Sequence, residues 1–137
     1  MVSKKLDLQA IQYINLFSKI TGTRARDCFQ YADHLIFEVP PFLLSKTIGE
    51  KGGNIKKLGA MIKRKIKVIA TTQDMEEFIK ALVYPIKFKN MVVENDEVII
   101  YAAPQSKAML IGRGSVKLEE LREILKNHFN VKKLRVL

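Results

Sequence analysis

The chain has 137 residues, of which 24 are Lys or Arg and 14 are Asp or Glu, so its formal net charge is +10. Apolar residues make up 47% of the sequence, which excludes a disordered polar chain. The longest apolar run, Val98 to Ala103, has six residues, far fewer than the ~18 that a membrane-spanning helix needs. The single cysteine, Cys28, excludes an internal disulfide and a zinc site built from several cysteines. We therefore expect a soluble, cytoplasmic, basic protein that does not enter a membrane.

The excess of positive charge lies mainly in the first half of the chain. Residues 1–72 carry 13 basic and 5 acidic side chains, a net charge of +8, whereas residues 73–137 carry 11 and 9, a net charge of +2. Clustered cations bind polyanions strongly because binding releases condensed counterions. This distribution favours nucleic-acid binding by the first half, although positive charge also serves solubility alone.

Each half is predicted to contain three helices and three strands. In the first half these are a helix over residues 6–20, strands over 24–31 and 35–39, helices over 42–47 and 54–65, and a strand over 67–70. In the second half they are a helix over 75–83, strands over 86–93 and 97–102, helices over 104–110 and 117–128, and a strand over 131–136. The helices follow from apolar residues at helical spacing and the strands from apolar runs divided by turn residues. Three strands with helices on one side make a two-layer α+β unit.

The two halves are predicted to be copies of one unit. When the sequence is shifted by 63 residues, Cys28–Ile66 aligns without gaps with Met91–Phe129, and Gly49 falls on Gly112. The apolar positions also correspond, so both copies would bury the same face. We therefore predict two homologous domains, over residues 1–72 and 73–137.

The candidate binding site is a glycine-rich corner between the last two helices of the first unit. It comprises Ile48, Gly49, Glu50, Lys51, Gly52, Gly53, Asn54, Ile55, Lys56 and Lys57. Glycine has no Cβ, so a phosphate chain can approach such a loop closely, and the N–H groups near Gly52, Gly53 and Asn54 would hold it. The lysines add positive charge, and the two isoleucines are candidate walls of an apolar base-binding groove. A glycine turn with solvated lysines explains the same residues without a ligand.

The corresponding corner of the second unit departs from this pattern. It consists of Gly112, Arg113, Gly114, Ser115 and Lys117, so that a serine stands at the last glycine position. Three carboxylates follow it, Glu119, Glu120 and Glu123, and they repel a phosphate strand. We therefore predict a degenerate second loop with secondary RNA contacts, and a first loop that supplies most of the affinity.

The residues carry a resemblance to a known family. The pattern Ile-Gly-x-x-Gly-x-x-Ile between two helices, from Ile48 to Ile55, resembles the signature of the KH domain, whose loop holds about four single-stranded nucleotides. The extra leading helix and strand are similar to the type II arrangement. Two such units in tandem, with Thr21-Gly22-Thr23-Arg24-Ala25-Arg26-Asp27-Cys28 in the first and Asn127-His128-Phe129 in the second, resemble the archaeal NusA-like transcription factors. These correspond to the KH pair of bacterial NusA without its N-terminal and S1 parts.

The resemblance implies two tandem type II KH domains, each with a three-stranded sheet covered on one face by helices. It also implies a non-catalytic protein that binds single-stranded RNA, the nascent transcript, in transcription elongation and termination, with RNA polymerase as a further candidate partner. We expect a monomer without a cofactor. No nucleophile lies beside a base, which argues against catalysis, and His34 and His128 lack ligand-spaced neighbours, which argues against a metal site. Two alternatives stay open: a protein–protein adaptor on RNA polymerase or the ribosome, and a ribosome-biogenesis KH protein.

Overall fold

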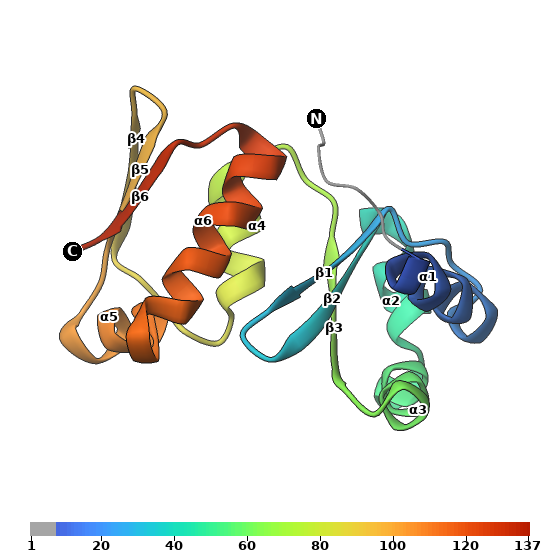
Figure 1. Cartoon of the computed structure of the whole chain (residues 1–137). Coiled ribbons are helices and arrows are strands. Elements are labelled where there is room, and N and C mark those ends of the chain that lie inside the picture. The colour runs from blue at the N-terminus through green and yellow to red at the C-terminus, as the bar shows by residue number, and fades with distance from the viewer. Residues whose placement is uncertain (1–7) are drawn as a thin grey trace. The chain divides into compact units, whose positions relative to one another are not determined.

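The computed structural model describes residues 8–137, which form two compact units, residues 8–74 and 75–137 (Figure 1). Each unit combines one three-stranded sheet with helices, which confirms the α+β fold class. The predicted first helix begins at residue 6, and its first two residues lie outside the described part. In the described part, no helix is long and apolar enough to cross a membrane.

The first unit follows the predicted element order. Its elements are α1 (Leu8–Thr21), β1 (Asp27–Tyr31), β2 (His34–Val39), α2 (Leu44–Ile48), α3 (Gly53–Ile62) and β3 (Lys65–Ala70), with single 3-10 turns at Pro41–Leu43 and Glu50–Gly52. Strand β2 is central, antiparallel to β1 and parallel to β3. Ala32 and Asp33 join β1 to β2 with φ angles of 51° and 66°, as a two-residue hairpin of type I′ requires.

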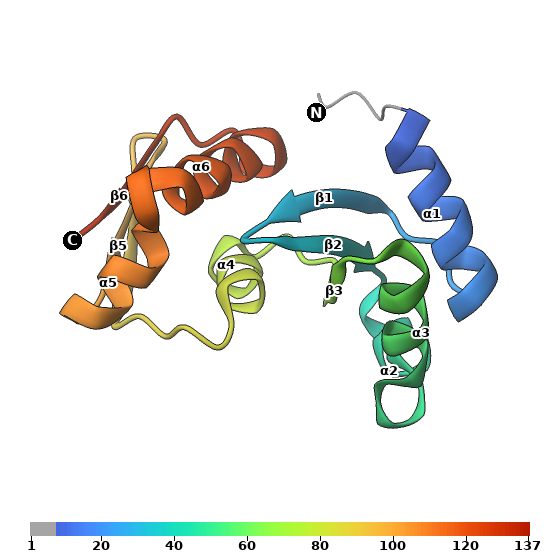
Figure 2. The ribbon, with the colours of Figure 1, turned by 60° about the horizontal axis from the view of Figure 1, so that its bottom comes forward.

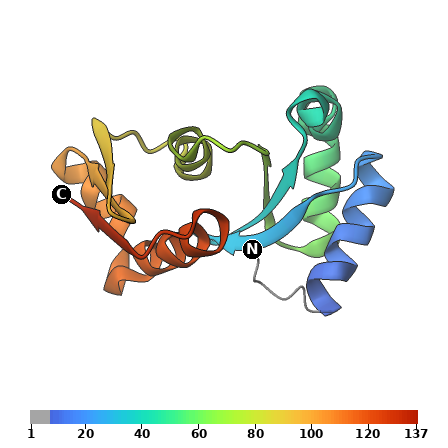
Figure 3. The same ribbon diagram turned by 90° about the horizontal axis from the view of Figure 1, so that it is seen from above.

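The core of the first unit lies between its sheet and its helices. Figures 2 and 3 show α1, α2 and α3 on the same side of the sheet. Alternate residues of β2, among them Leu35 and Phe37, are buried in this layer with Leu58 of α3. The rings of Phe17 on α1 and Phe37 stack with their centroids 4.2 Å apart. Burial of these large apolar side chains fixes the helices on which the glycine corner is built.

The second unit repeats this topology. It consists of α4 (Met75–Val83), β4 (Asn90–Glu94), β5 (Glu97–Tyr101), α5 (Pro104–Ile111), a 3-10 turn (Arg113–Ser115), α6 (Val116–Phe129) and β6 (Lys133–Val136). Strand β5 is antiparallel to β4 and parallel to β6. The edge of Phe78 on α4 packs against the ring of Phe129 on α6, with centroids 5.4 Å apart. The repeat predicted from the sequence is therefore a structural repeat.

The gapless alignment of the two copies is correct at first and wrong at its end. The hairpin registers agree, because Cys28 faces Phe37 as Met91 faces Ile100. Helix α6, however, has 14 residues, whereas α3 has 10. Strand β6 therefore starts later than the alignment predicts. The residue equivalent to Ile66 is Leu134, because it pairs with β5 as Ile66 pairs with β2. Phe129, which the gapless alignment placed on Ile66, is instead the last residue of α6.

Several predicted element ends are also wrong. The strand expected over 24–31 begins only at Asp27, and the strand expected over 131–136 begins only at Lys133. The helix expected over 54–65 ends at Ile62, because Lys63 turns to a φ of 65° and closes the helix in the left-handed conformation. The strand expected over 86–93 begins only at Asn90, and residues 86–89 form an irregular connection after α4.

Candidate nucleic-acid interface

The first glycine corner is a compact loop between α2 and α3. It opens with Gly49, at φ 83° and ψ 171°, and continues through Lys51 and Gly52, whose φ angles are 54° and 71°. The N–H of Gly52 donates to the carbonyl of Gly49 at 3.2 Å, and the N–H of Gly53 donates to the carbonyl of Glu50. Two of the three N–H groups predicted to hold phosphate, those of Gly52 and Gly53, are thus already used inside the loop.

The three glycines of this corner have different surroundings. A Cβ on Gly49 would lie 3.0 Å from the Asn54 side chain and 3.1 Å from the Asn54 backbone nitrogen. A Cβ on Gly52 or Gly53 would meet nothing within 4 Å. Gly49 is therefore required by packing inside the protein, whereas Gly52 and Gly53 leave open space that a ligand backbone can enter.

Asn54 ties the start of α3 to the end of α2. Its side-chain Nδ2 donates to the carbonyl of Thr47 at 3.1 Å and lies 3.5 Å from the carbonyl of Lys46. Carbonyls in the last turn of a helix have no partner within the helix, so this amide satisfies groups that would otherwise need water. The residue predicted to contact phosphate thus has a structural role in its side chain.

Buried hydroxyls hold α2 from the other side, and the sequence analysis did not assign them to the site. The Thr47 hydroxyl is fully buried and lies 2.7 Å from the carbonyl of Leu43 and 2.9 Å from the hydroxyl of Thr23. The hydroxyl of Thr21 bonds the carbonyl of Phe17 at 2.8 Å and accepts from the N–H of Thr23 at 3.1 Å. Two of these hydroxyls belong to Thr21 and Thr23, which lie in the Thr21–Cys28 segment that resembles the NusA-like family.

The surface around the first corner is positively charged. Lys51, Lys56 and Lys57 are exposed, and none of them has an ion-pair partner among residues 8–137. Ile48 and Ile55 are half-buried on either side of the corner, at the end of α2 and in the first turn of α3. Unpaired ammonium groups at the positive end of a helix attract an anion.

The second corner has the same backbone as the first despite its different residues. Gly112 has φ 76° and ψ 169°, and Gly114 and Ser115 follow with φ angles of 63° each. A Cβ on Gly112 would lie 3.0 Å from the Lys117 side chain, which stands where Asn54 stands in the first copy. The loop is degenerate in sequence only, because Gly114 and Ser115 adopt the torsions of Lys51 and Gly52.

Side-chain charge distinguishes the two corners. Arg122 on α6 bonds Glu119 at 2.8 Å and lies 4.0 Å from Glu123, so one guanidinium serves two carboxylates. The hydrogen bond to Glu119 raises the pKa of Arg122 above its usual range. Arg113 remains an exposed cation in the loop. The second corner therefore presents the geometry of the first in a nearly neutral setting.

Two units of this topology, each with a glycine corner between two helices, define a tandem type II KH protein. No family model matches the chain. It is 26% identical over 137 residues to the "Probable transcription termination protein NusA" of Methanococcus vannielii, covering 97% of this chain and 79% of that protein. It is 27% identical over 130 residues to the protein of the same name in Halobacterium salinarum, covering 93% and 94%. The crystal structure of APE1850 superposes with a TM-score of 0.72 at 28% identity, over 96% of this chain and 99% of that one. These similarities confirm the resemblance of the chain to the archaeal NusA-like proteins.

Proposed function

We propose that this chain is a non-catalytic RNA-binding protein that acts in transcription elongation and termination. The archaeal relatives bear the name of a transcription termination protein. The first unit would hold single-stranded RNA, the nascent transcript, at the corner from Ile48 to Lys57. The observation that carries this proposal is the pairing of open space at Gly52 and Gly53 with three exposed lysines that lack ion-pair partners among the described residues.

In this proposal, electrostatic attraction supplies most of the grip. The N–H groups of Gly52 and Gly53 donate within the loop, so the phosphates are held by Lys51, Lys56, Lys57 and the positive end of α3. Glycine at positions 52 and 53 lets the strand come close to these groups. The bases would lie against the apolar side chains of Ile48 and Ile55. Gly112, Arg113, Gly114, Ser115 and Lys117 would add a weaker, secondary contact.

Two substitutions, one in each corner, test which corner contributes more to RNA affinity. Gly52→Asp and Gly114→Asp place a carboxylate at loop positions where a Cβ meets nothing within 4 Å. Asp is among the residues that best accept a positive φ, so both variants should fold. We expect Gly52→Asp to weaken single-stranded RNA binding at least tenfold, because a like charge beside phosphate costs more than 1.4 kcal/mol, and Gly114→Asp to weaken it less than about threefold.

Fluorescence anisotropy with a labelled unstructured RNA measures both affinities, and circular dichroism verifies the folds. Equal losses of affinity in the two variants would refute the prediction that the first corner contributes more than the second. Unchanged binding in both would refute the role of the corners in RNA binding.

The transcription role is tested by crosslinking RNA to the protein in cells. Nascent messenger RNA is the expected crosslinked species. Ribosomal RNA would instead support a ribosome-biogenesis protein. Little RNA beside a strong interaction with RNA polymerase or the ribosome would support the adaptor, which the nearly neutral second unit also suits. Sedimentation of the purified chain, in the buffer of the anisotropy titrations, checks the predicted monomer.

A further inference from the structure

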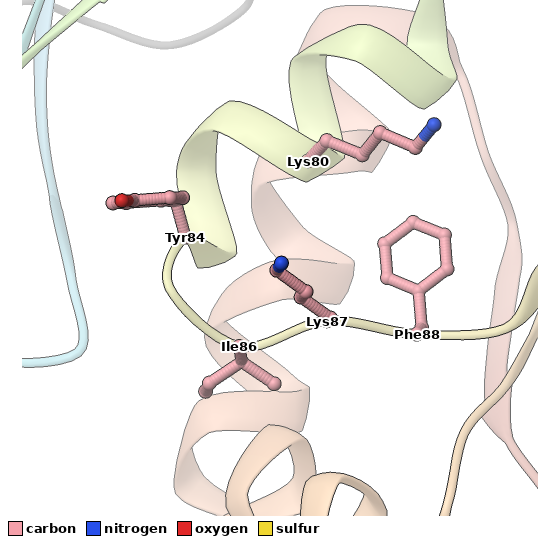
Figure 4. A pocket seen from close by; sticks show the side chains of 5 residues that line it. All are labelled: Lys80, Tyr84, Ile86, Lys87 and Phe88. Carbon is pink, nitrogen blue, oxygen red and sulfur yellow. The ribbon is translucent and has the colours of Figure 1, made fainter.

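The second unit contains a pocket of about 280 Å³ that lies outside its glycine corner (Figure 4). It is lined by Lys80, Tyr84, Ile86, Lys87 and Phe88. Lys80 belongs to α4 and Tyr84 follows the last residue of that helix, while the other three come from the irregular connection before β4. The pocket therefore exists because residues 86–89 do not join the sheet.

The pocket combines aromatic and cationic side chains. Tyr84 is 67% exposed, Ile86 and Phe88 are half-buried, and both lysines are exposed. In Figure 4, Lys87 lies between Tyr84 and Phe88, and the Lys80 side chain extends above the Phe88 ring. A volume of 280 Å³ lies just below the usual range for ligand pockets, which suits one planar ring system better than an extended ligand.

The local charge favours an anionic ligand. Lys80, Lys87 and Lys89 lie within residues 78–93, a stretch without any acidic residue, although the whole second half carries a net charge of only +2. Lys80 forms an ion pair with Glu76 at 3.2 Å, in which the side chains are 54% and 46% exposed. Such an exposed pair contributes little, so a phosphate can replace the carboxylate. Lys87 has no ion-pair partner in the described part of the chain.

The first unit lacks the side chains that line this pocket. Helix α1 ends at Thr21 and β1 begins at Asp27, whereas α4 ends at Val83 and β4 begins at Asn90, so the connection is one residue longer in the second unit. With the helix ends aligned, Tyr84 corresponds to Gly22, which has no side chain, and Lys80 corresponds to Ser18. The aromatic ring and the ammonium group are thus specific to the second copy and are not a by-product of the repeated fold.

We propose that this pocket binds one unpaired base of single-stranded RNA. The base stacks on the exposed ring of Tyr84, and the phosphates that flank it lie at Lys80 and Lys87. Every base has a π-face, so this contact tolerates any sequence. The proposal rests on the RNA binding proposed above, and it adds to the second unit a contact that its nearly neutral glycine corner does not supply.

Substitution of the aromatic side chain tests the stacking. The full-length chain is titrated with a labelled, unstructured single-stranded RNA by fluorescence anisotropy. We expect Tyr84→Ala to weaken binding about five- to 150-fold, the range that loss of one base–aromatic stack produces. Tyr84→Phe retains the ring and should bind within about twofold of the wild type. Tyr101→Ala removes another exposed tyrosine of the same unit and is the matched control, with unchanged affinity.

The salt dependence tests the phosphate contact. Lys87→Gln should reduce the slope of log K against log salt by about 0.7, the value for one phosphate on a single strand. Lys132→Gln, at a side chain that is 79% exposed, should leave the slope unchanged.

Three outcomes would refute base binding in this pocket, and they distinguish it from the proposed RNA binding by the whole chain. If Tyr84→Ala binds RNA like the wild type while Gly52→Asp does not, the pocket is wrong and the proposed function stands. If the wild-type chain binds no single-stranded RNA, both are wrong. If Tyr84→Ala keeps its RNA affinity but loses binding to purified RNA polymerase, the pocket belongs to a protein partner.

Discussion

At the scale of single residues, glycines with similar torsions have different reasons to be glycine. Gly49 and Gly112 share an extended conformation with positive φ that is essentially confined to glycine. Each lies against the residue five positions later, Asn54 or Lys117. Two left-handed residues follow in each corner, Lys51 and Gly52 in the first and Gly114 and Ser115 in the second. Lys51 and Ser115 therefore adopt a positive φ without being glycine. That conformation is strained but accessible to other residues, which explains how the second corner keeps its shape.

Substitution of two neighbouring glycines by alanine should therefore give opposite results. Gly49→Ala should lower the free energy of unfolding by about 2 kcal/mol or more, because its torsions are strained for alanine and its Cβ would crowd Asn54. Gly53→Ala should raise that free energy by about 0.4–1 kcal/mol, since Gly53 is already helical and its Cβ meets nothing. Urea denaturation of each variant measures both values. A Gly49→Ala variant as stable as the wild type would contradict the packing requirement.

At the scale of elements, the corner depends on how α2 and α3 are held together. The Asn54 amide joins the two helices, and the buried hydroxyls of Thr47 and Thr23 join α2 to the segment after α1. In the second unit the residue equivalent to Thr47 is Leu110, which is fully buried and has no hydroxyl. One repeat therefore supports its corner with hydrogen bonds and the other with apolar contact.

This difference predicts a non-additive pair of substitutions. Thr47→Val should lower the free energy of unfolding by about 1–2 kcal/mol, because it leaves the buried Thr23 hydroxyl without its partner. The double variant Thr23→Val with Thr47→Val should recover part of this loss, since it removes both partners with little change of shape. Thermal or urea unfolding of the two single variants and the double variant completes the cycle. A double variant whose loss is the sum of the single losses would show that the two hydroxyls do not interact.

At the scale of the whole molecule, charge is divided between two units of one fold. The first half carries a net charge of +8 and the second a net charge of +2, and the two corners share one backbone conformation. The difference in expected RNA affinity therefore comes from side chains and not from loop shape. The domain boundary predicted between residues 72 and 73 stays a prediction.

Neutralising three lysines of each unit tests this division. Changing Lys51, Lys56 and Lys57 together to Gln should reduce the slope of log K against log salt by about 2, at roughly 0.7 for each phosphate. The matched variant changes Lys126, Lys132 and Lys133, which are also exposed, and should reduce the slope by less than about 0.7. RNA titrations at several salt concentrations measure both slopes. Equal reductions would mean that the positive field acts as a whole and that the first corner is not favoured.

Much of the fold followed from local pattern. Apolar periodicity and turn residues predicted the order of all six elements in each unit, because helix and strand spacing is written in consecutive residues. The ends of elements were harder to predict. The extra turn of α6 displaced β6 from the gapless alignment. Residues 86–89 are not part of β4, although they alternate apolar and charged side chains as a strand does. Strand pairing depends on distant partners, which local pattern does not contain.

By itself, the sequence determined the α+β repeat, the NusA-like resemblance and the position of the two glycine corners. Only the tertiary structure decided what the residues of those corners do. It placed the Asn54 side chain on the end of α2, used the N–H groups of Gly52 and Gly53 inside the loop, and gave Ser115 the torsions of a glycine. It also opened the pocket beside Tyr84. The reason is that spacing along a chain reports which residues are neighbours in sequence, whereas a site is made by side chains and carbonyls that meet only after the helices have packed.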